Sequence, residues 1–535
     1  MPDFILDTRK EAPEHKDKPA FLKWWLYKVI IREKLQNTAG LIFFSLAAVF
    51  MGVVAGKLGV VPMVLIAGAA IGIPVGLGVI FNLKFGVILL YVLLFTVLGV
   101  TRLIPGIPFG ISFDAITVGL LYGLIVKQAT ERDWSFAWHP IGILVLIWIL
   151  YNLALVANPW AQSRLAWVYT IRSIAAIMIL YYILLYTIDS IAFLKLLIYL
   201  WLGLAFVGAL YGIYQDIFGL MAFEWAWLTA DPVRFRRYYQ FGNVRVWSYF
   251  SGPMVFGVLM SLSAVATIYM AGTVKRLGLK IAFVFAAFIM LYGMIVSGTR
   301  AAYVVPIIAI VTFVIFKGDK RILVASAVGG FLFMSFINIP FSNDRIRQFQ
   351  SAFKPGDDSS FEVRQMNQAF IKPFIRSHPI GGGLGSTGVW GQRFSPNSPL
   401  SQFPPDSGYV RTAVEAGWVG LLIFNSLLFL IGYEGIKNYF KIRDPDLKIM
   451  QLMLIAVLYG LMLTNYPQET IGSPPINAIF FLCAAGVTNI LKIDNKLALD
   501  RQRRRDLGEE VEEEPHLIER PSLFEFLNLK NPNRP

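Results

Sequence analysis

Charged residues are scarce in this sequence. Aspartate, glutamate, lysine and arginine make up 15% of its 535 residues, whereas 56% are hydrophobic and the mean hydropathy is +0.60. Soluble globular domains carry about a quarter of their residues as charged groups, so this composition excludes a water-soluble fold. The sequence therefore predicts a protein that crosses a membrane many times.

Cysteine and the usual targeting and nucleotide-binding signals are missing as well. Cys483 is the only cysteine, so no disulfide can form within the chain and cysteine chemistry does not indicate a compartment. The first 36 residues lack the short apolar region and cleavage site of a signal peptide, and we expect the first spanning helix to direct insertion. The glycine run Gly381–Gly385 lacks the strand and the Lys-Ser/Thr pair of a phosphate loop. We therefore expect no nucleotide cofactor.

The net charge of +14 would suggest nucleic acid as the partner of a soluble protein. Here no basic and aromatic nucleic-acid module is recognisable, and the excess is accounted for by basic residues in loops between apolar segments. We expect membrane lipids, and no nucleic acid, among the partners.

Apolar windows of roughly 17 to 25 residues predict about fourteen transmembrane helices, of which the first two are the least certain. The predicted spans are 38–56, 60–81, 85–101, 112–127, 140–157, 166–187, 191–214, 248–272, 279–298, 301–316, 322–338, 416–434, 447–465 and 475–491. The predicted fold is an all-α polytopic membrane protein. No internal repeat of the kind found in many secondary transporters is evident.

Lysine and arginine counts predict the orientation, because cytoplasmic loops are enriched in both. With the N-terminus inside, alternate loops that carry basic residues all fall in the cytoplasm. Those residues are Lys84, Lys127, Arg132, Lys275, Arg276, Lys280, Lys317, Lys320, Arg321, Lys437, Lys441 and Arg443. The charged C-terminal tail also falls inside, so we predict that both termini are cytoplasmic.

These predictions divide the chain into five segments. They are a basic, amphipathic cytoplasmic segment (1–36), helices one to eleven (37–338), a large extracytoplasmic loop (339–415), helices twelve to fourteen (416–491) and a charged cytoplasmic tail (492–535). The large loop is the only long polar interval between apolar spans, and loops of this length are usually functional or disordered. Apolar residues at helical spacing from Ser359 to Arg376 favour order, so we predict a partly helical loop that houses recognition and chemistry.

Arginines collect on the predicted outer side, where basic residues should be few. The loop before the eighth span carries Arg234, Arg236, Arg237 and Arg245. Arg300 follows at the outer end of the ninth span, and Arg172 lies about two turns inside the sixth. Charged groups at membrane depth usually face a polar cavity or a partner, and arginine binds phosphate oxygens with two parallel hydrogen bonds. A cavity surrounded by these arginines would suit a lipid diphosphate; the alternative is that each extends towards lipid headgroups.

Four short motifs carry a resemblance to a known family. They are RVWSYFSGP at 245–253, SGTRAAYV at 297–304, an arginine, helix and HPIGGGLG arrangement over 364–385, and DSGYVRTAVEAGWVG at 406–420. In this order they resemble the bacterial O-antigen ligase and O-antigen polymerase superfamily of membrane glycosyltransferases. The ligases carry His, then Asn, Ser or Gln, nine residues, and Gly-x-x-Gly. This sequence keeps the spacing from Ser407 to Gly417 and Gly420, but Asp406 stands where the ligases have histidine.

The resemblance implies a reaction and a set of residues. Members of the family move a sugar chain from undecaprenyl diphosphate to an acceptor hydroxyl on the outer face of the inner membrane, without nucleotide sugar and, in the ligases, without a required metal. It implies Arg245 and Arg300 as the diphosphate clamp and Asp406 as the general base. Substrate-binding candidates are Arg172, Arg237, Arg364, His378, Tyr409 and Glu469.

Several of these residues have other interpretations. Asp406 follows two prolines, and aspartate is a common helix cap. His378 is the only histidine of the large loop and a second candidate for the base, but His-Pro before a glycine run is also an ordinary helix stop. Glu469 is a third candidate for the base, or a sugar ligand. Tyr409 could stack on a sugar or anchor at the membrane interface.

Three functions follow from the sequence. The first is a polymerase that joins lipid-linked repeat units, which the aspartate in place of the ligase histidine favours. The second is a ligase that passes a finished glycan to lipid A core or to protein. The third is a transporter, which would place its ionisable residues near the bilayer midplane on broken helices, whereas here they gather at the outer face.

Overall fold

A computed structural model of the chain describes residues 60–103, 110–240, 242–318, 320–341, 350, 353 and 359–507, together with single residues and pairs between 42 and 57. The chain divides into two units, Met1–Leu77 and Gly78–Pro535. Of the first unit the structure describes those short pieces, which are helical, and the greater part of α3 (Val60–Phe81). The predicted amphipathic segment, most of the span predicted at 38–56 and the end of the charged tail lie outside the described residues.

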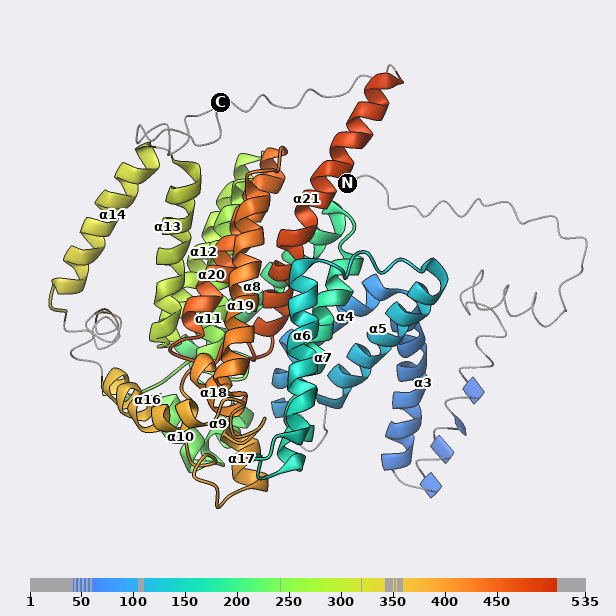
Figure 1. Ribbon diagram of the computed structural model, residues 1–535, viewed down its shortest axis with the longest axis vertical. Coiled ribbons are helices and arrows are strands. Elements are labelled where there is room, and N and C mark those ends of the chain that lie inside the picture. The colour runs from blue at the N-terminus through green and yellow to red at the C-terminus, as the bar shows by residue number, and fades with distance from the viewer. Residues whose placement is uncertain are drawn as a thin grey trace, which may run out of the picture. The chain divides into compact units, whose positions relative to one another are not determined.

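The second unit is a bundle of long apolar helices (Figure 1). Within the described residues, eleven helical segments are long and apolar enough to cross a membrane. They are α4 (Leu83–Leu103), α5 (Gly110–Glu131), α6 (Pro140–Ala154) with η2 (Leu155–Ala157), α7 (Arg164–Thr187), α8 (Ile191–Phe218), α11 (Pro253–Ala271), α12 (Leu277–Val296), η3 (Arg300–Tyr303) with α13 (Val304–Lys317), α19 (Gly417–Tyr439), α20 (Pro445–Thr464) and α21 (Ile476–Asp506). Each coincides with a predicted span, and the prediction of an all-α polytopic membrane protein is confirmed.

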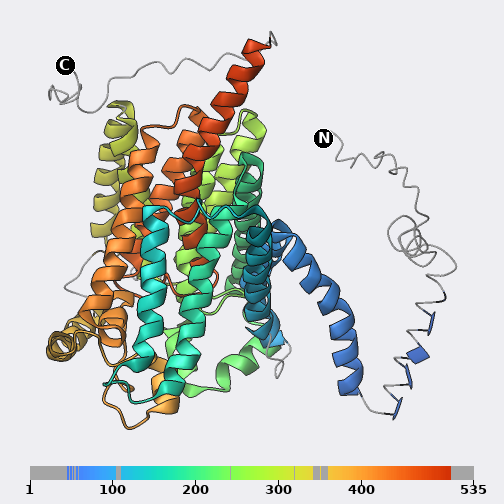
Figure 2. The same cartoon turned by 45° about the vertical axis from the view of Figure 1, so that its right-hand side comes forward.

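The remaining elements of the second unit are short helices, one pair of short strands and two helices of 19 residues, and the first of these two helices coincides with the span predicted at 322–338. They are α9 (Ala222–Thr229), α10 (Pro232–Tyr238), β1 (Tyr239–Gln240), β2 (Asn243–Val244), α14 (Lys320–Asn338), α16 (Ser359–Ser377), α17 (Gly388–Phe394) and α18 (Gly408–Glu415). The two strands form one antiparallel pair. In both views α9, α10, α16, α17 and α18 gather at one end of the bundle, and the C-terminal part of α21 projects from the other (Figures 1 and 2). The arginine-rich loop and the large loop therefore share one end, as the predicted topology requires.

Three helices form the interior of the bundle. Buried residues make up 89% of the apolar window in α11, 72% in α20 and 89% in α21. These helices carry small and hydroxyl residues that let neighbours approach and pair; Trp201 of α8, for example, donates from Nε1 to the Ser263 hydroxyl at 2.9 Å. A packed interior of this kind holds the helix ends in fixed positions, so the loops at those ends have a rigid support.

Ion pairs mark the end of the bundle opposite to α16–α18. Lys84 at the start of α4 contacts Asp189 at 2.7 Å, and Arg501 of α21 contacts Asp444 at 3.1 Å. Asp494 accepts hydrogen bonds from the backbone N–H groups of Arg443 and Asp444 at 3.1 and 3.0 Å. Lys84 and Arg501, two basic residues that the sequence assigns to the cytoplasm, thus form ion pairs at one end of the bundle.

A labelling experiment tests the predicted orientation. Cys483 is buried, so a Cys483→Ala background should accept single cysteines at exposed positions on opposite ends, Asn397→Cys and Lys441→Cys. A membrane-impermeant maleimide should label Asn397→Cys in cells with an intact inner membrane and Lys441→Cys only after lysis, because the positive-inside rule places the lysine-rich end in the cytoplasm. The reverse pattern would overturn the predicted topology.

Candidate active site

Arg245 is held in place by the SGTRAAYV motif. Its Nε donates to the Ser297 carbonyl at 3.1 Å, and its Nη2 donates to the Gly298 carbonyl at 3.4 Å and the Thr299 hydroxyl at 3.1 Å. Thr299 in turn donates to the Pro253 carbonyl at 2.9 Å. Two of the motifs quoted from the sequence therefore bind each other, and their contact fixes the plane of the Arg245 guanidinium.

The charge of Arg245 is balanced by no carboxylate among the residues that the structure describes. Burial lowers the pKa of its guanidinium below the ordinary value, and the neighbouring charge of Arg300 lowers it further. The two arginines that the sequence assigned to one clamp are thus close enough to repel each other. A partly buried pair of like charges stabilises an anion placed between or beside them.

A cavity of about 370 Å³ opens beside this arginine. It is lined by Arg237, Tyr238, Gln240, Arg245, Ser251, Gly252, Pro253, Met254, Val255 and Ser473. Helix α11 begins here, and its N-cap, Gly252, offers no side chain to the first backbone N–H groups. The positive end of the helix dipole therefore adds to the arginine charges at this cavity. We refer to it below as the arginine cavity.

Arg102, at the end of α4, shapes the same region, although its sequence position gave no sign of a role. It donates to the carbonyls of Phe250 and Ser251 at 2.5 and 3.1 Å. Its guanidinium lies 4.3 Å from the centre of the Trp227 ring, where a cation is attracted by the ring face. Arg102 thereby holds the turn that precedes α11.

On the other side of the site, HPIGGGLG and DSGYVRTAVEAGWVG cross each other. Gly382 and Gly383 donate from their backbone N–H groups to the carbonyls of Val414 and Glu415 at 2.8 and 3.0 Å, and Val419 donates to the Pro379 carbonyl at 3.1 Å. Gly417 has a φ of +73°, and a Cβ there would collide with the Pro379 carbonyl oxygen. The first glycine of Gly-x-x-Gly is required by this crossing.

A buried carboxylate joins the two crossing segments. Glu415 accepts hydrogen bonds from the Gly385 N–H at 3.0 Å, the Thr387 hydroxyl at 2.5 Å and the Arg411 Nε at 3.1 Å. Arg411 also pairs with Glu469 through Nη1 at 2.6 Å. The Glu415 carboxylate raises the pKa of Arg411 most strongly, and the Glu469 carboxylate raises it further. Arg411 therefore links the large loop to the loop that follows α20.

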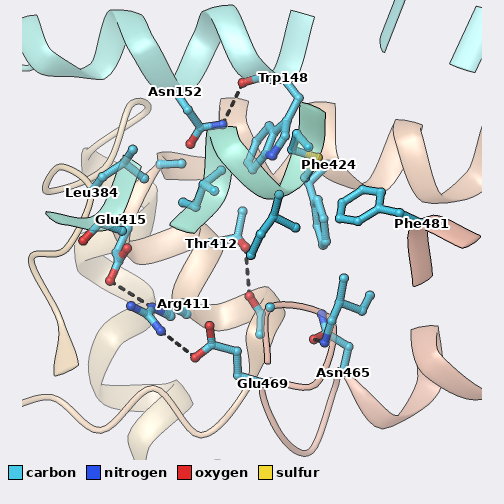
Figure 3. A pocket seen from close by; sticks show the side chains of 18 residues that line it. Trp148, Asn152, Leu384, Arg411, Thr412, Glu415, Phe424, Asn465, Glu469 and Phe481 are labelled. Atoms are coloured by element: carbon cyan, nitrogen blue, oxygen red, sulfur yellow. Dashed lines mark hydrogen bonds and ion pairs between the residues drawn. The ribbon is translucent and has the colours of Figure 1, made fainter. Parts of the chain in front are cut away.

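These charged groups line a second cavity, of about 150 Å³, which we call the ring cavity. Its lining comprises Trp148, Asn152, Thr170, Ile174, Ile177, Met178, Leu384, Gly408, Arg411, Thr412, Glu415, Ala416, Phe424, Asn465, Glu469, Ile471, Gly472 and Phe481. Figure 3 shows Trp148 and Asn152 on one side, with Arg411, Glu469 and Asn465 across from them. Ser473 lines the arginine cavity and Gly472 the ring cavity. One short loop therefore lies between the two.

Asp406 is exposed beside this site. The Asn367 amide of α16 donates to its carboxylate at 3.2 Å. The capping role considered for Asp406 falls to the next residue instead, because α18 begins at Gly408 and the Ser407 hydroxyl accepts the hydrogen bond of the Val410 N–H. The Asp406 carboxylate is therefore not needed to cap the N-terminus of α18 and is accessible to a substrate.

Of the other predicted residues, some face a cavity and others are paired elsewhere. Arg172 pairs with Asp114 of α5 at 3.1 Å and lines neither of the two cavities. Arg364 lies on α16, half-buried. Tyr409 donates its hydroxyl to the Met462 carbonyl of α20 at 2.7 Å, and Glu469 faces the ring cavity. The structure thus brings Arg237 and Arg245 together in one cavity, with the Arg300 charge acting on Arg245, and gives Arg172 a separate partner.

His378 is engaged within the loop itself. Its Nδ1 lies 3.0 Å from the Phe374 carbonyl, and its ring stacks on Phe374 with centroids 4.0 Å apart. Trp160 meets the same ring edge-on at 5.0 Å. His378 therefore closes α16 against the loop between η2 and α7, which is the helix-stop role considered for it.

The comparison with protein-family models agrees with this arrangement. Residues 285–425 match the model of the O-antigen ligase family. Over these residues the chain is similar to the O-antigen ligase and O-antigen polymerase superfamily. The match includes SGTRAAYV, HPIGGGLG and the Gly-x-x-Gly segment, and the resemblance inferred from those motifs is confirmed. A search of curated proteins gave no match. The family match and the many apolar helices point to an integral inner-membrane protein, and the family implies a glycosyltransferase-type enzyme that acts on lipid-linked glycans.

Sequence inspection missed two residues of this ligase domain that the structure makes prominent. Arg411 and Glu415 are spaced four apart on one face of a short helix, a spacing typical of an exposed helical ion pair. The same spacing was present in the sequence, but only the structure shows that Glu415 is buried and that the pair reaches Gly385 and Glu469.

The crossing of the two ligase-domain motifs makes a prediction about stability. Gly417→Ala should place a methyl group against Pro379 and cost about 1–3 kcal/mol of overpacking beyond the strain of a positive φ. Gly388→Ala is the matched control, because Gly388 also has a positive φ (+63°) but its Cβ would meet open space; it should cost about 1–2 kcal/mol. Thermal unfolding in detergent should show a clearly larger loss for Gly417→Ala. Equal losses would contradict the close contact.

Proposed function

We propose that this protein transfers a glycan from undecaprenyl diphosphate to an acceptor hydroxyl at the outer face of the inner membrane, in the manner of an O-antigen or exopolysaccharide polymerase. The observation that supports this most directly is the arginine cavity. Arg237 and Arg245 line it, α11 points its N-terminus at it, and Arg245 has no carboxylate partner among the described residues. An anion with several oxygens satisfies all of these groups.

The reaction depends mainly on stabilisation of the negative charge on the departing diphosphate. When an acceptor hydroxyl attacks C1 of the first sugar, a C–O bond forms and the bond from C1 to the diphosphate oxygen breaks. The diphosphate leaves with the electron pair, so donors aimed at it lower the barrier. Arg245 is positioned for this role, because Ser297 and Thr299 fix its orientation before any substrate arrives.

We propose that Asp406 is the general base that accepts the proton of the acceptor hydroxyl. It occupies the family position of the base, it lies exposed at the start of α18, and Asn367 orients it. Glu469 is the alternative, but one of its carboxylate oxygens is already engaged by Arg411 at 2.6 Å. His378 is less suited, because Phe374 and Trp160 pack against its ring.

The acceptor distinguishes a polymerase from a ligase. A polymerase passes the chain to another lipid-linked repeat unit, and a ligase passes it to lipid A core or to protein. The aspartate in place of the ligase histidine favours the polymerase, and the ligase is the second candidate. A transporter is disfavoured because the arginine cavity and Asp406 lie at the helix ends, at the end of the bundle where α16–α18 gather (Figure 1).

Arg245→Lys tests whether the arginine cavity binds the diphosphate. Lysine keeps the positive charge but cannot make the paired hydrogen bonds of the guanidinium, so transfer should fall by on the order of 10²-fold, as for loss of one oxyanion donor. The assay is chain growth on an undecaprenyl-diphosphate oligosaccharide by protein in nanodiscs. Arg236→Lys is the matched control, since Arg236 is exposed on α10 and lines neither cavity. Equal activity of both variants would show that Arg245 does not bind the diphosphate.

Asp406→Asn tests the base. Asparagine retains the size of the side chain, and Ser407 still caps α18, so the fold should persist while turnover falls by about 10²- to 10⁴-fold. Glu469→Gln should lower turnover less. Full turnover in Asp406→Asn together with loss in Glu469→Gln would move the base to Glu469. Growth of lipid-linked chains identifies a polymerase, and transfer only to a separate acceptor identifies a ligase.

A further inference from the structure

The ring cavity combines apolar walls with polar groups. Trp148, Phe424 and Phe481 supply aromatic surface, while Asn152, Asn465 and Glu469 supply oxygen and nitrogen atoms (Figure 3). A site for an acyl or isoprenoid chain would need only the first set, and a site for an ion would need only the second. The mixture is typical of a site for a small polyhydroxylated molecule.

Two residues that line this cavity each carry a buried polar atom without a hydrogen-bond partner among the residues that the structure describes. Asn152 is fully buried and Trp148 is 4% exposed. The Asn152 Nδ2 donates to the Trp148 carbonyl at 2.7 Å, but the Asn152 Oδ1 and the Trp148 Nε1 make no hydrogen bond. Buried polar groups are almost always paired, and both residues line the ring cavity. A ligand in this cavity would reach both atoms after a small side-chain adjustment and would supply the missing partners.

The volume limits the size of that ligand. An engineered protein cavity of about 150 Å³ admits benzene, and the ring cavity has about the same volume. It therefore limits the buried part of the ligand to about one six-membered ring. A benzene ring would leave the Asn152 and Trp148 atoms unpaired, whereas the hydroxyls of a pyranose can donate to Asn152 and accept from Trp148.

We infer that the ring cavity binds one sugar ring of the lipid-linked glycan. The inference rests on the proposed function and adds to it the place where the glycan is recognised. The aromatic side chains pack against the C–H faces of the ring, and Asn152, Trp148 and Glu469 bind its hydroxyls. The loop from Asn465 to Ser473 contributes residues to both cavities, so one substrate can place its diphosphate on one side of this loop and a sugar on the other.

A binding measurement with two lipids tests this inference. Protein in nanodiscs is titrated with undecaprenyl diphosphate and with the same lipid carrying an oligosaccharide. Asn152→Leu keeps the shape of the side chain and removes its amide. It should weaken binding of the glycosylated lipid roughly three- to tenfold, the range expected for a lost hydrogen bond, and leave the bare lipid unchanged.

Other outcomes would overturn the inference. Unchanged affinity for both lipids would show that the ring cavity holds only water. Tighter binding of both would show that it holds the isoprenoid chain, because leucine makes the wall more apolar. The proposed function is tested separately by Arg245→Lys, which should weaken binding of both lipids. If it weakens neither, the diphosphate does not bind in the arginine cavity, and this conclusion is independent of the result for Asn152→Leu.

Two further variants guard against a general loss of folding. Trp148→Phe removes the indole N–H and should reproduce the selective loss for the glycosylated lipid, which a folding defect would not. Gln128→Met is the matched control: Gln128 is buried on α5, has an unpartnered Oε1 and does not line the ring cavity. It should leave the affinity for both lipids unchanged, and a selective loss in Gln128→Met would overturn the assignment to the ring cavity.

Discussion

A buried carboxylate requires charged or hydrogen-bonding partners, and Glu415 has this requirement at the centre of the site. Its partners are the Gly385 N–H, the Thr387 hydroxyl and the Arg411 guanidinium. If one of them were removed, an incompletely paired carboxylate would remain buried, which is strongly destabilising. The carboxylate therefore holds the glycine run, α18 and, through Arg411, Glu469 in one arrangement. The ring cavity exists because these segments cannot separate.

The arginine cavity depends on a different constraint. Arg245 carries a partly buried charge whose hydrogen bonds go to carbonyl and hydroxyl oxygens, and Arg102 holds the turn that leads into α11. Both arginines fix backbone positions at the start of a helix, where the dipole favours an anion. The loop between α20 and α21 supplies Ser473 to this cavity and Glu469 to the other. In the proposed function, binding of a diphosphate and recognition of a glycan are thus joined through one short segment.

The long helices could be predicted from the sequence, because apolar windows of bilayer length have few alternative structures. The helix from Ser359 was also predictable from its spacing, and the structure ends it one residue later, at Ser377. The site was predicted only in part. Arg245, Arg237 and Glu469 stood out as charges near membrane ends, but the burial of Glu415 depends on a chain crossing that no local pattern reveals. Arg172 drew attention for the same reason as Arg245, yet its ion pair with Asp114 depends on which face of α7 meets α5.

The position of the diphosphate tests the central claim most directly. A cryo-EM map of the protein in nanodiscs with undecaprenyl diphosphate bound should show both phosphates in the arginine cavity, with oxygens within hydrogen-bond distance of Arg245 and next to the first turn of α11. Density for the phosphates beside Arg172 and Asp114, or at the lysine-rich end of the bundle, would contradict the account.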